Sequence, residues 1–269
     1  AVASAQVKSC ILLAGLYAKG RTRVSEPRLS RDHTERMLPH FGVKVEQGPS
    51  ITGGQVLRAA DIQVPADPSS AAFLAAAALL VPDSDVLLCG VGLNTTRDGF
   101  FRVLELMGAQ LDYLDRRDSG GEPVADIRVR YRAGLKGIDV PVEWIPSMID
   151  EVPILLALAS QAAGVTRIRE AEELRVKESD RLAVMARGLA AMGIKLEEYP
   201  DGIDVHGGPA ARAPVEACHD HRCAMSFAVL GLRSMGGSDI SGAEFIDTSY
   251  PDFRVHLASL GARVKVGGA

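Results

Sequence analysis

The sequence predicts an α/β protein built from repeated units, and three observations lead to this prediction. Four segments read as an amphipathic helix that ends at a glycine and continues into an alternating strand. A second, apolar helical segment lies upstream of each of them. The spacing from the start of the apolar segment to the glycine is nearly constant, at 38, 39, 43 and 41 residues. Such regularity indicates four copies of one helix-strand-helix-strand unit.

The apolar helix comes first in each unit. We expect these helices, rich in small and aliphatic side chains, within residues 4–18, 69–81, 150–164 and 220–235. The amphipathic helices and their strands follow within residues 35–46, 101–114, 184–199 and 253–266. The closing glycines are Gly42, Gly108, Gly193 and Gly261. Glycine commonly ends a helix because it adopts the left-handed backbone at little steric cost, and apolar alternation after it favours a half-buried strand.

The loops between copies indicate where the chain divides. Glycine-rich and proline-rich stretches such as "PSITGGQ" and "HGGPAARAP" separate the units. The segment "VPADPSSAAF", residues 64–73, reads as a hinge. We therefore place a domain boundary there, and a single continuous α/β domain with glycine-rich loops is the alternative.

Composition excludes several classes of function. The 269 residues suffice for two domains, and 47% apolar with only 5% aromatic residues predicts cores of Ala, Leu, Val and Ile. A formal net charge of −4 argues against a nucleic-acid or anionic-membrane binder, which would carry a basic excess. The longest apolar run, residues 71–81, is too short to span a bilayer. Four cysteines without a CxxC pair favour free thiols in a reducing cytoplasm.

Polar residues gather at the N-terminal ends of the expected helices. In "LRVKESDRL" we expect Lys177 and Arg181 in the first turns of a helix, where the helix dipole disfavours cations. Helix N-termini also offer unpaired N–H groups, so several around a cleft would bind an anion without a metal. An ordinary surface ion pair explains any single cation, and repetition across the units favours an anion site. The helix-start residues are Ser4, Gln6, Arg31, Asp32, Arg97, Asp98, Asp150, Lys177, Glu178, Arg181, Asp220 and Arg222, among which Asp32 and Asp98 are expected N-caps.

Two of these residues are acids placed among cations. Asp150 and Glu178 suit general acid-base catalysis on a ligand that carries phosphate or carboxylate groups. No GxSxG, P-loop or HExxH motif competes with them. The residues alone therefore predict acid-base chemistry on an anionic ligand.

Seven segments, in their order and spacing, closely resemble the 5-enolpyruvylshikimate-3-phosphate (EPSP) synthase family. They are "SAQVKS", "SRDHTERML", "DPSSAAF", "PSMIDEVPIL", "ELRVKESDRL", "DHRCAMSF" and "SYPDF". The match runs from end to end, and "RVKESDR" and "DHR.AM" separate it from the related UDP-N-acetylglucosamine enolpyruvyl transferases. The resemblance implies six βαβαββ units, three in each of two domains, with the active site in the cleft between the domains.

By this resemblance the four copies counted above are the last four of six. Residues 1–64 would form the last unit of the first domain and residues 65–269 the second domain, with the hinge near residues 64–70. The opening region of the family, which brings a Lys-Ser pair and several arginines to both substrates, has no counterpart here. Residue 1 is Ala inside an apolar periodic segment. We therefore expect that an N-terminal portion is missing or lies on a separate partner polypeptide.

The resemblance also implies an activity, that of a 3-phosphoshikimate 1-carboxyvinyltransferase in the shikimate pathway to chorismate and the aromatic amino acids. The enolpyruvyl group of phosphoenolpyruvate would pass to the 5-hydroxyl of shikimate-3-phosphate with release of phosphate, in the cytoplasm and without a cofactor or metal. Implied ligands of shikimate-3-phosphate are Ser4, Ala5, Gln6, Arg31, Asp150 and Lys177. Implied ligands of phosphoenolpyruvate are Gln6, Arg181 and Arg222. The implied catalytic residues are Asp150, Glu178 and Lys177, whereas Thr248, where some members carry lysine, receives no role.

Three other interpretations stay open. One is transfer of enolpyruvyl to another alcohol such as a UDP-sugar, although "DHR" and the absence of a cysteine in the expected loop oppose it. Another is a non-catalytic binding module, or one half of a split enzyme that needs a partner chain. The last is a repeat protein without a ligand, which would leave the helix-start cations without partners.

Overall fold

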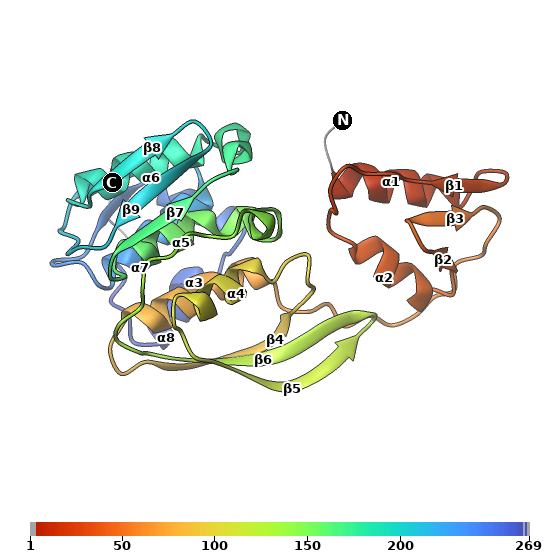
Figure 1. The fold of residues 1–269 in the computed structure, drawn as a ribbon. Coiled ribbons are helices and arrows are strands. Elements are labelled where there is room, and N and C mark those ends of the chain that lie inside the picture. The colour runs from red at the N-terminus through yellow and green to blue at the C-terminus, as the bar shows by residue number, and fades with distance from the viewer. Residues whose placement is uncertain (1–3, 266, 268–269) are drawn as a thin grey trace.

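The first unit folds as a small lobe, residues 4–58, which lies to the right in Figure 1. The structure is a computed structural model that describes residues 4–265 and 267. Helices α1 (Ala5–Gly15) and α2 (His33–His40) pack with three short strands, β1 (Arg21–Arg23), β2 (Val45–Glu46) and β3 (Ser50–Thr52). The strands pair antiparallel in the order β1-β3-β2.

The next two units repeat this arrangement within the large lobe, residues 66–265. The second unit contains α3 (Pro68–Leu80), β4 (Asp85–Gly92), α4 (Gly99–Leu106), β5 (Leu111–Ser119) and β6 (Glu122–Arg130). The third contains α5 (Val152–Ala159), β7 (Val165–Ile168), α6 (Arg181–Ala191), β8 (Leu196–Tyr199) and β9 (Gly202–His206). Their sheets have the orders β4-β6-β5 and β7-β9-β8. In all three units the last strand therefore lies between the other two, which confirms the predicted repeat.

The fourth unit differs from the other three. It contains β10 (Pro214–Glu216), α7 (His221–Gly231), β11 (Asp239–Ser241) and α8 (Phe253–Ser259), and β10 pairs parallel with β11. The strand expected after Gly261 does not form in residues 262–265, and Val266 lies outside the described residues. Four 3₁₀ helices complete the described elements: η1 (Val142–Ser147), η2 (Ile149–Glu151), η3 (Glu172–Val176) and η4 (Ala243–Thr248).

A further strand precedes the apolar helix in the large lobe, which the residues alone did not predict. Single parallel bridges join Ala66 to Val91 and Lys136 to Ala163, as β10 joins β11. A strand before the helix that runs parallel to the strand after it makes a crossover connection. In the second and third units this pairing completes the βαβαββ order that the family resemblance implied. The α/β fold class is confirmed.

The four glycines end their helices as predicted. Each lies two positions after the last residue of α2, α4, α6 or α8. Their φ angles are +79°, +95°, +84° and +95°, which is the left-handed backbone that favours glycine.

The two lobes have separate apolar cores. The small lobe is built on Leu12, Leu16, Leu38, Val43 and Ile51. The large lobe has one continuous core in which every residue of α5 is buried. Figure 1 shows α3, α5 and α7 between the sheets, and α5 and α7 both contact α3. These cores lie on either side of the predicted boundary near residues 64–70, which remains our proposal. No helix within the described ranges is long and apolar enough to cross a membrane.

Candidate active site

Asp150 lies at the centre of a group of four cations. It sits on η2 at the start of the apolar helix α5. Its carboxylate is 2.8 Å from Arg31 Nη2 and 3.3 Å from Arg181 Nη1, and 3.9 Å from Lys177 Nζ and 4.0 Å from Arg222 Nη2. Burial alone would raise the pKa of Asp150, but the charge of Arg222 and the charge and hydrogen bond of Arg31 hold it well below its usual value.

A buried ion pair fixes one of these cations. Arg181, the first residue of α6, has 1% of its side chain exposed, and its Nε donates to Asp220 Oδ2 at 2.8 Å. Asp220 is fully buried and also caps α7, accepting hydrogen bonds from the backbone N–H groups of Arg222 and Cys223. Arg181 also donates to Glu178 at 2.5 Å. The arginine is therefore held by carboxylates on three sides, counting Asp150.

A second buried cluster lies directly behind Asp150. Glu151 is 2% exposed and accepts a hydrogen bond from Ser69 Oγ at the start of α3. Arg97 Nη2 lies 3.5 Å and Arg222 Nη1 3.8 Å from the Glu151 carboxylate. Burial raises the pKa of Glu151 despite the charge of Arg97. Sequence reasoning missed Glu151 and Ser69 as site residues, although "IDEVP" and "DPSSAAF" place both at starts of apolar helices.

The small lobe contributes to the Asp150 group through one residue. Arg31 crosses to the large lobe, whereas Ser4, Ala5 and Gln6 make no hydrogen bond or ion pair with that group among the described residues. Ser4 caps α1 by accepting from Val7 N at 3.4 Å. The structure thus joins Asp150, Lys177, Glu178, Arg181, Arg222 and Arg31, and leaves the other three predicted residues on the adjoining lobe.

One local prediction was wrong, and two were confirmed in position only. Lys177 does not lie in a first helical turn, because α6 begins only at Arg181 and Asp180 caps it by accepting from Ala183 N. Asp32 and Asp98 occupy N-cap positions but make no capping hydrogen bond. Asp32 instead accepts hydrogen bonds from Arg36 Nε. Asp98 is partly buried, and burial raises the pKa of its carboxyl group.

The cations are also better partnered than the sequence argument assumed. Arg31 and Arg181 contact carboxylates, and Lys177 pairs with Glu173 on η3 as well as approaching Asp150. Arg222 is the least satisfied of the four. Within the described part of the chain its guanidinium makes one hydrogen bond, from Nη1 to the Asp150 backbone oxygen at 3.2 Å, and its buried Nε has no partner. Arg222 therefore keeps the most unused hydrogen-bonding capacity of the four, although its side chain, 16% exposed, is less open than those of Arg31 and Lys177.

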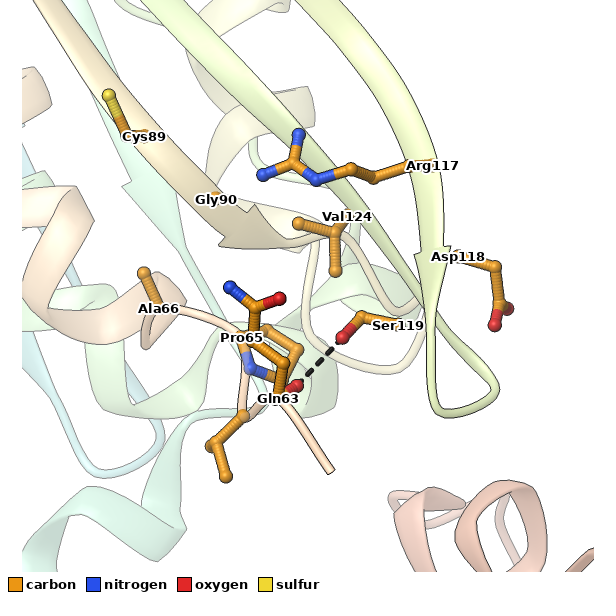
Figure 2. Close-up of a pocket in the computed structure, with 10 residues that line it drawn as sticks. Gln63, Pro65, Ala66, Cys89, Gly90, Arg117, Asp118, Ser119 and Val124 are labelled. Atoms are coloured by element: carbon orange, nitrogen blue, oxygen red, sulfur yellow. Dashed lines mark hydrogen bonds between the residues drawn. The ribbon is translucent and has the colours of Figure 1, made fainter. Parts of the chain in front are cut away.

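A cavity of about 400 Å³ lies away from these residues, beside the segment that joins the lobes. Figure 2 shows it between residues 63–66, Cys89 and Gly90 on β4, and residues 117–119 on β5, with Ser119 Oγ donating to the Gln63 backbone oxygen at 2.7 Å. None of the predicted site residues lines it. Within the described residues no three His, Cys, Asp or Glu side chains are grouped as a metal site requires.

Comparison with known proteins gives consistent matches. Residues 1–257 match the family described as EPSP synthase (3-phosphoshikimate 1-carboxyvinyltransferase). A 3-phosphoshikimate 1-carboxyvinyltransferase of Xanthomonas euvesicatoria pv. vesicatoria (strain 85-10) is 49% identical over 270 residues, covering 99% of this chain and 61% of that protein. One of Geobacter metallireducens is 50% identical over 266 residues, covering 97% of this chain and 62% of that protein.

Solved structures agree with these matches. EPSP synthase from Acinetobacter baumannii superposes with a TM-score of 0.94 at 47% identity, covering 99% of this chain and 62% of that chain. The enolpyruvyl transferase NikO from Streptomyces tendae, at 23% identity and a TM-score of 0.77 over 94% of this chain and 58% of its own, shares the fold. The chain therefore spans about 61% of the length of the curated relatives it matches.

Proposed function

The chain belongs to the EPSP synthase family, and from this premise we propose that it transfers the enolpyruvyl group of phosphoenolpyruvate to the 5-hydroxyl of shikimate-3-phosphate with release of phosphate. The observation that carries the proposal is the set of four cations around Asp150, which come from both lobes. Two anionic substrates that react with each other need a site of this kind, where cations surround an acid-base group.

The two substrates divide the cations between them. Shikimate-3-phosphate is bound by Ser4, the backbone of Ala5, Gln6, Arg31, Asp150 and Lys177. Phosphoenolpyruvate is bound by Gln6, Arg181 and Arg222. The assignment of Arg222 is supported by its unpartnered Nε, and that of Arg181 by the Asp220 pair, which holds its guanidinium in one orientation.

Asp150, Glu178 and Lys177 carry the chemistry. Asp150 takes the proton from the 5-hydroxyl as the oxygen adds to C2 of phosphoenolpyruvate, and Glu178 gives a proton to C3. The tetrahedral intermediate then breaks its C–O bond to phosphate while Glu178 removes a proton from C3. Lys177 and the arginines offset the charge that develops on the departing phosphate.

The low pKa of Asp150 sets a condition on this mechanism. A general base works best when its pKa is near the operating pH, and Arg222 and Arg31 hold the pKa of Asp150 far below that. Substrate phosphate and carboxylate groups that engage Arg31, Lys177 and Arg222 would offset these charges. On this proposal Asp150 is a stronger base with both substrates bound than in the unfilled site.

We place this activity in the cytoplasm, where free thiols such as the exposed Cys10 and Cys89 persist. The relatives are longer than this chain. Turnover is therefore tested both with the chain alone and with the remaining length of a relative added.

Phosphate release tests the proposal directly. The purified chain is given shikimate-3-phosphate and phosphoenolpyruvate, alone and with the segment of a relative to which it does not align. Glu178→Gln should turn over at least about a hundredfold more slowly, the usual scale of general acid-base catalysis, whereas Glu172→Gln, an exposed acid on the preceding η3, should not change the rate. If a folded chain released no phosphate in either sample, the proposed function would be refuted. Phosphate release with a UDP-sugar as acceptor would instead indicate a transferase for that sugar.

A further inference from the structure

Lys8 is a charged residue buried in the small lobe. Its side chain on α1 is 1% exposed, and its Nζ lies 3.0 Å from Glu26 Oε1 and 2.8 Å from Glu35 Oε1. The same Nζ donates to the Ser30 backbone oxygen at 3.3 Å. Burial would lower the pKa of Lys8, but the hydrogen bonds with Glu35 and Glu26 raise it above its usual value, so the group stays charged.

These contacts join the two segments that carry the substrate residues of the small lobe. Lys8 follows Ser4 by one helical turn, and its backbone N–H donates to the Ser4 oxygen at 3.0 Å. Ser30 directly precedes Arg31, and Glu26 closes that loop by accepting from Ser30 N at 3.2 Å and Ser30 Oγ at 2.5 Å. One ammonium group therefore connects the first turn of α1 to the residue before Arg31.

We propose that Lys8 is a positioning residue. It would hold the start of α1, with Ser4, Ala5 and Gln6, in a fixed position relative to Arg31, so that both segments can bind the same shikimate-3-phosphate molecule. The inference rests on the function proposed above. Lys8 would not touch the substrate, since its Nζ is enclosed by Glu26, Glu35 and the loop backbone.

The surroundings favour positioning over simple stabilisation. The Nζ of Lys8 contacts polar groups of Glu26, Glu35 and Ser30, whereas Leu12 of the same helix lies in the apolar core of the small lobe. A buried charge cluster is weak evidence for stability, and fixing the register between segments is its best-attested use. Glu35 Oε2 is buried without a partner, so the cluster is not optimised for energy. The hydrogen bonds of Lys8 to Glu26 and to the Ser30 backbone oxygen require one conformation of the loop before Arg31. An apolar side chain at this position could not select that conformation.

Lys8→Met tests the inference, because methionine has a similar length and no charge. Lys19→Met, at an exposed position just after α1, is the matched control. Binding of shikimate-3-phosphate, and of phosphoenolpyruvate at saturating shikimate-3-phosphate, is measured by calorimetry on the full chain, supplemented as above if needed. Hydrogen exchange of residues 26–31 is followed by mass spectrometry.

We expect Lys8→Met to weaken shikimate-3-phosphate binding by about tenfold or more, the scale of a lost charged hydrogen bond. Phosphoenolpyruvate binding should weaken clearly less, because only Gln6 of its three proposed ligands lies on α1. Exchange of residues 26–31 should rise, and Lys19→Met should match the parent. Equal losses for both substrates would indicate general destabilisation and overturn the inference. Faster exchange with unchanged shikimate-3-phosphate affinity would also overturn it. Failure of the proposed function looks different, because the parent would then bind no shikimate-3-phosphate.

Discussion

Removal of the Asp220 carboxylate gives the most direct test of how the site is supported. Asp220→Ala leaves Arg181, which is 1% exposed, without its fully buried carboxylate partner at 2.8 Å. It also removes the side-chain cap of α7. Arg181 keeps its contacts with Asp150 and Glu178, so its charge is only partly uncompensated.

The expected loss can be worked out from these two contributions. Breaking a buried ion pair by removing one partner costs about 3–5 kcal/mol, and the remaining partners of Arg181 favour the lower end. Loss of an aspartate N-cap costs about 1 kcal/mol more. Asp220→Ala should therefore lower the free energy of unfolding by about 4 kcal/mol, and Asp220→Asn, which keeps a capping acceptor, by about 3 kcal/mol.

Urea unfolding of the parent and variants measures this directly. Asp239→Ala is the matched control, because Asp239 also pairs with an arginine, Arg212, but both side chains are more than half exposed. Such surface pairs contribute about 0–1 kcal/mol. If Asp220→Ala cost no more than Asp239→Ala, the Arg181–Asp220 pair would not hold the site together and the reasoning would be refuted.

Three other changes have expected outcomes. Burial would raise the pKa of Asp150, but the charges of Arg222 and Arg31 outweigh it and lower that pKa in the folded state. The charge of Asp150 therefore stabilises the fold above about pH 4, the pKa of an aspartate in the unfolded chain. Asp150→Asn should lose stability at pH 6, and urea titrations should show this deficit shrinking as the pH falls. Burial raises the pKa of Glu151, so its ionisation opposes folding as the pH rises above about 4. The stability of Glu151→Gln relative to the parent should therefore increase from pH 4 to pH 7. A decrease would contradict a raised pKa for Glu151. In Gly188→Ala the new Cβ would lie 2.2 Å from Cζ of the buried Phe227 ring, so thermal melting should show a loss of about 1–3 kcal/mol from overpacking.

The repeat could be predicted because it depends on local signals. Apolar runs, glycine stops and the spacing between them are visible in one segment at a time, and the structure places all four glycines at the same position after a helix. The parallel pairing before the apolar helix could not be predicted from the residues. In the second and third units it consists of single bridges such as Ala66 to Val91. A strand of one or two paired residues leaves no periodic pattern to detect.

The sequence analysis named the five charged residues that the structure groups with Asp150, but not Glu151 and Ser69 behind them. Lys177 was placed in a helix because the apolar periodicity of α6 was extended backwards across "VKES", but Asp180 caps the helix and ends that pattern. Glu151 was missed because a single acid beside Asp150 gives no sign of which way it faces. Whether a charged residue lies in the cleft or the core is decided by tertiary packing, here by Ser69 and Arg97 from other segments.

The opposite behaviour of Asp150 and Glu151 shows how the fold separates two roles within one short turn. Successive residues of η2 point in different directions, so Asp150 meets four cations while Glu151 reaches Ser69 in the core. Two buried carboxylates contact the cations from the core side. Asp220 accepts a hydrogen bond from Arg181, and the Glu151 carboxylate lies 3.8 Å from Arg222. Arg31, Lys177 and Arg181 are already paired with carboxylates, whereas Arg222 has an unpartnered Nε. A ligand anion that binds as we propose must replace some of these internal carboxylate contacts. Its affinity would then depend on how well its phosphate or carboxylate groups match the guanidinium orientations.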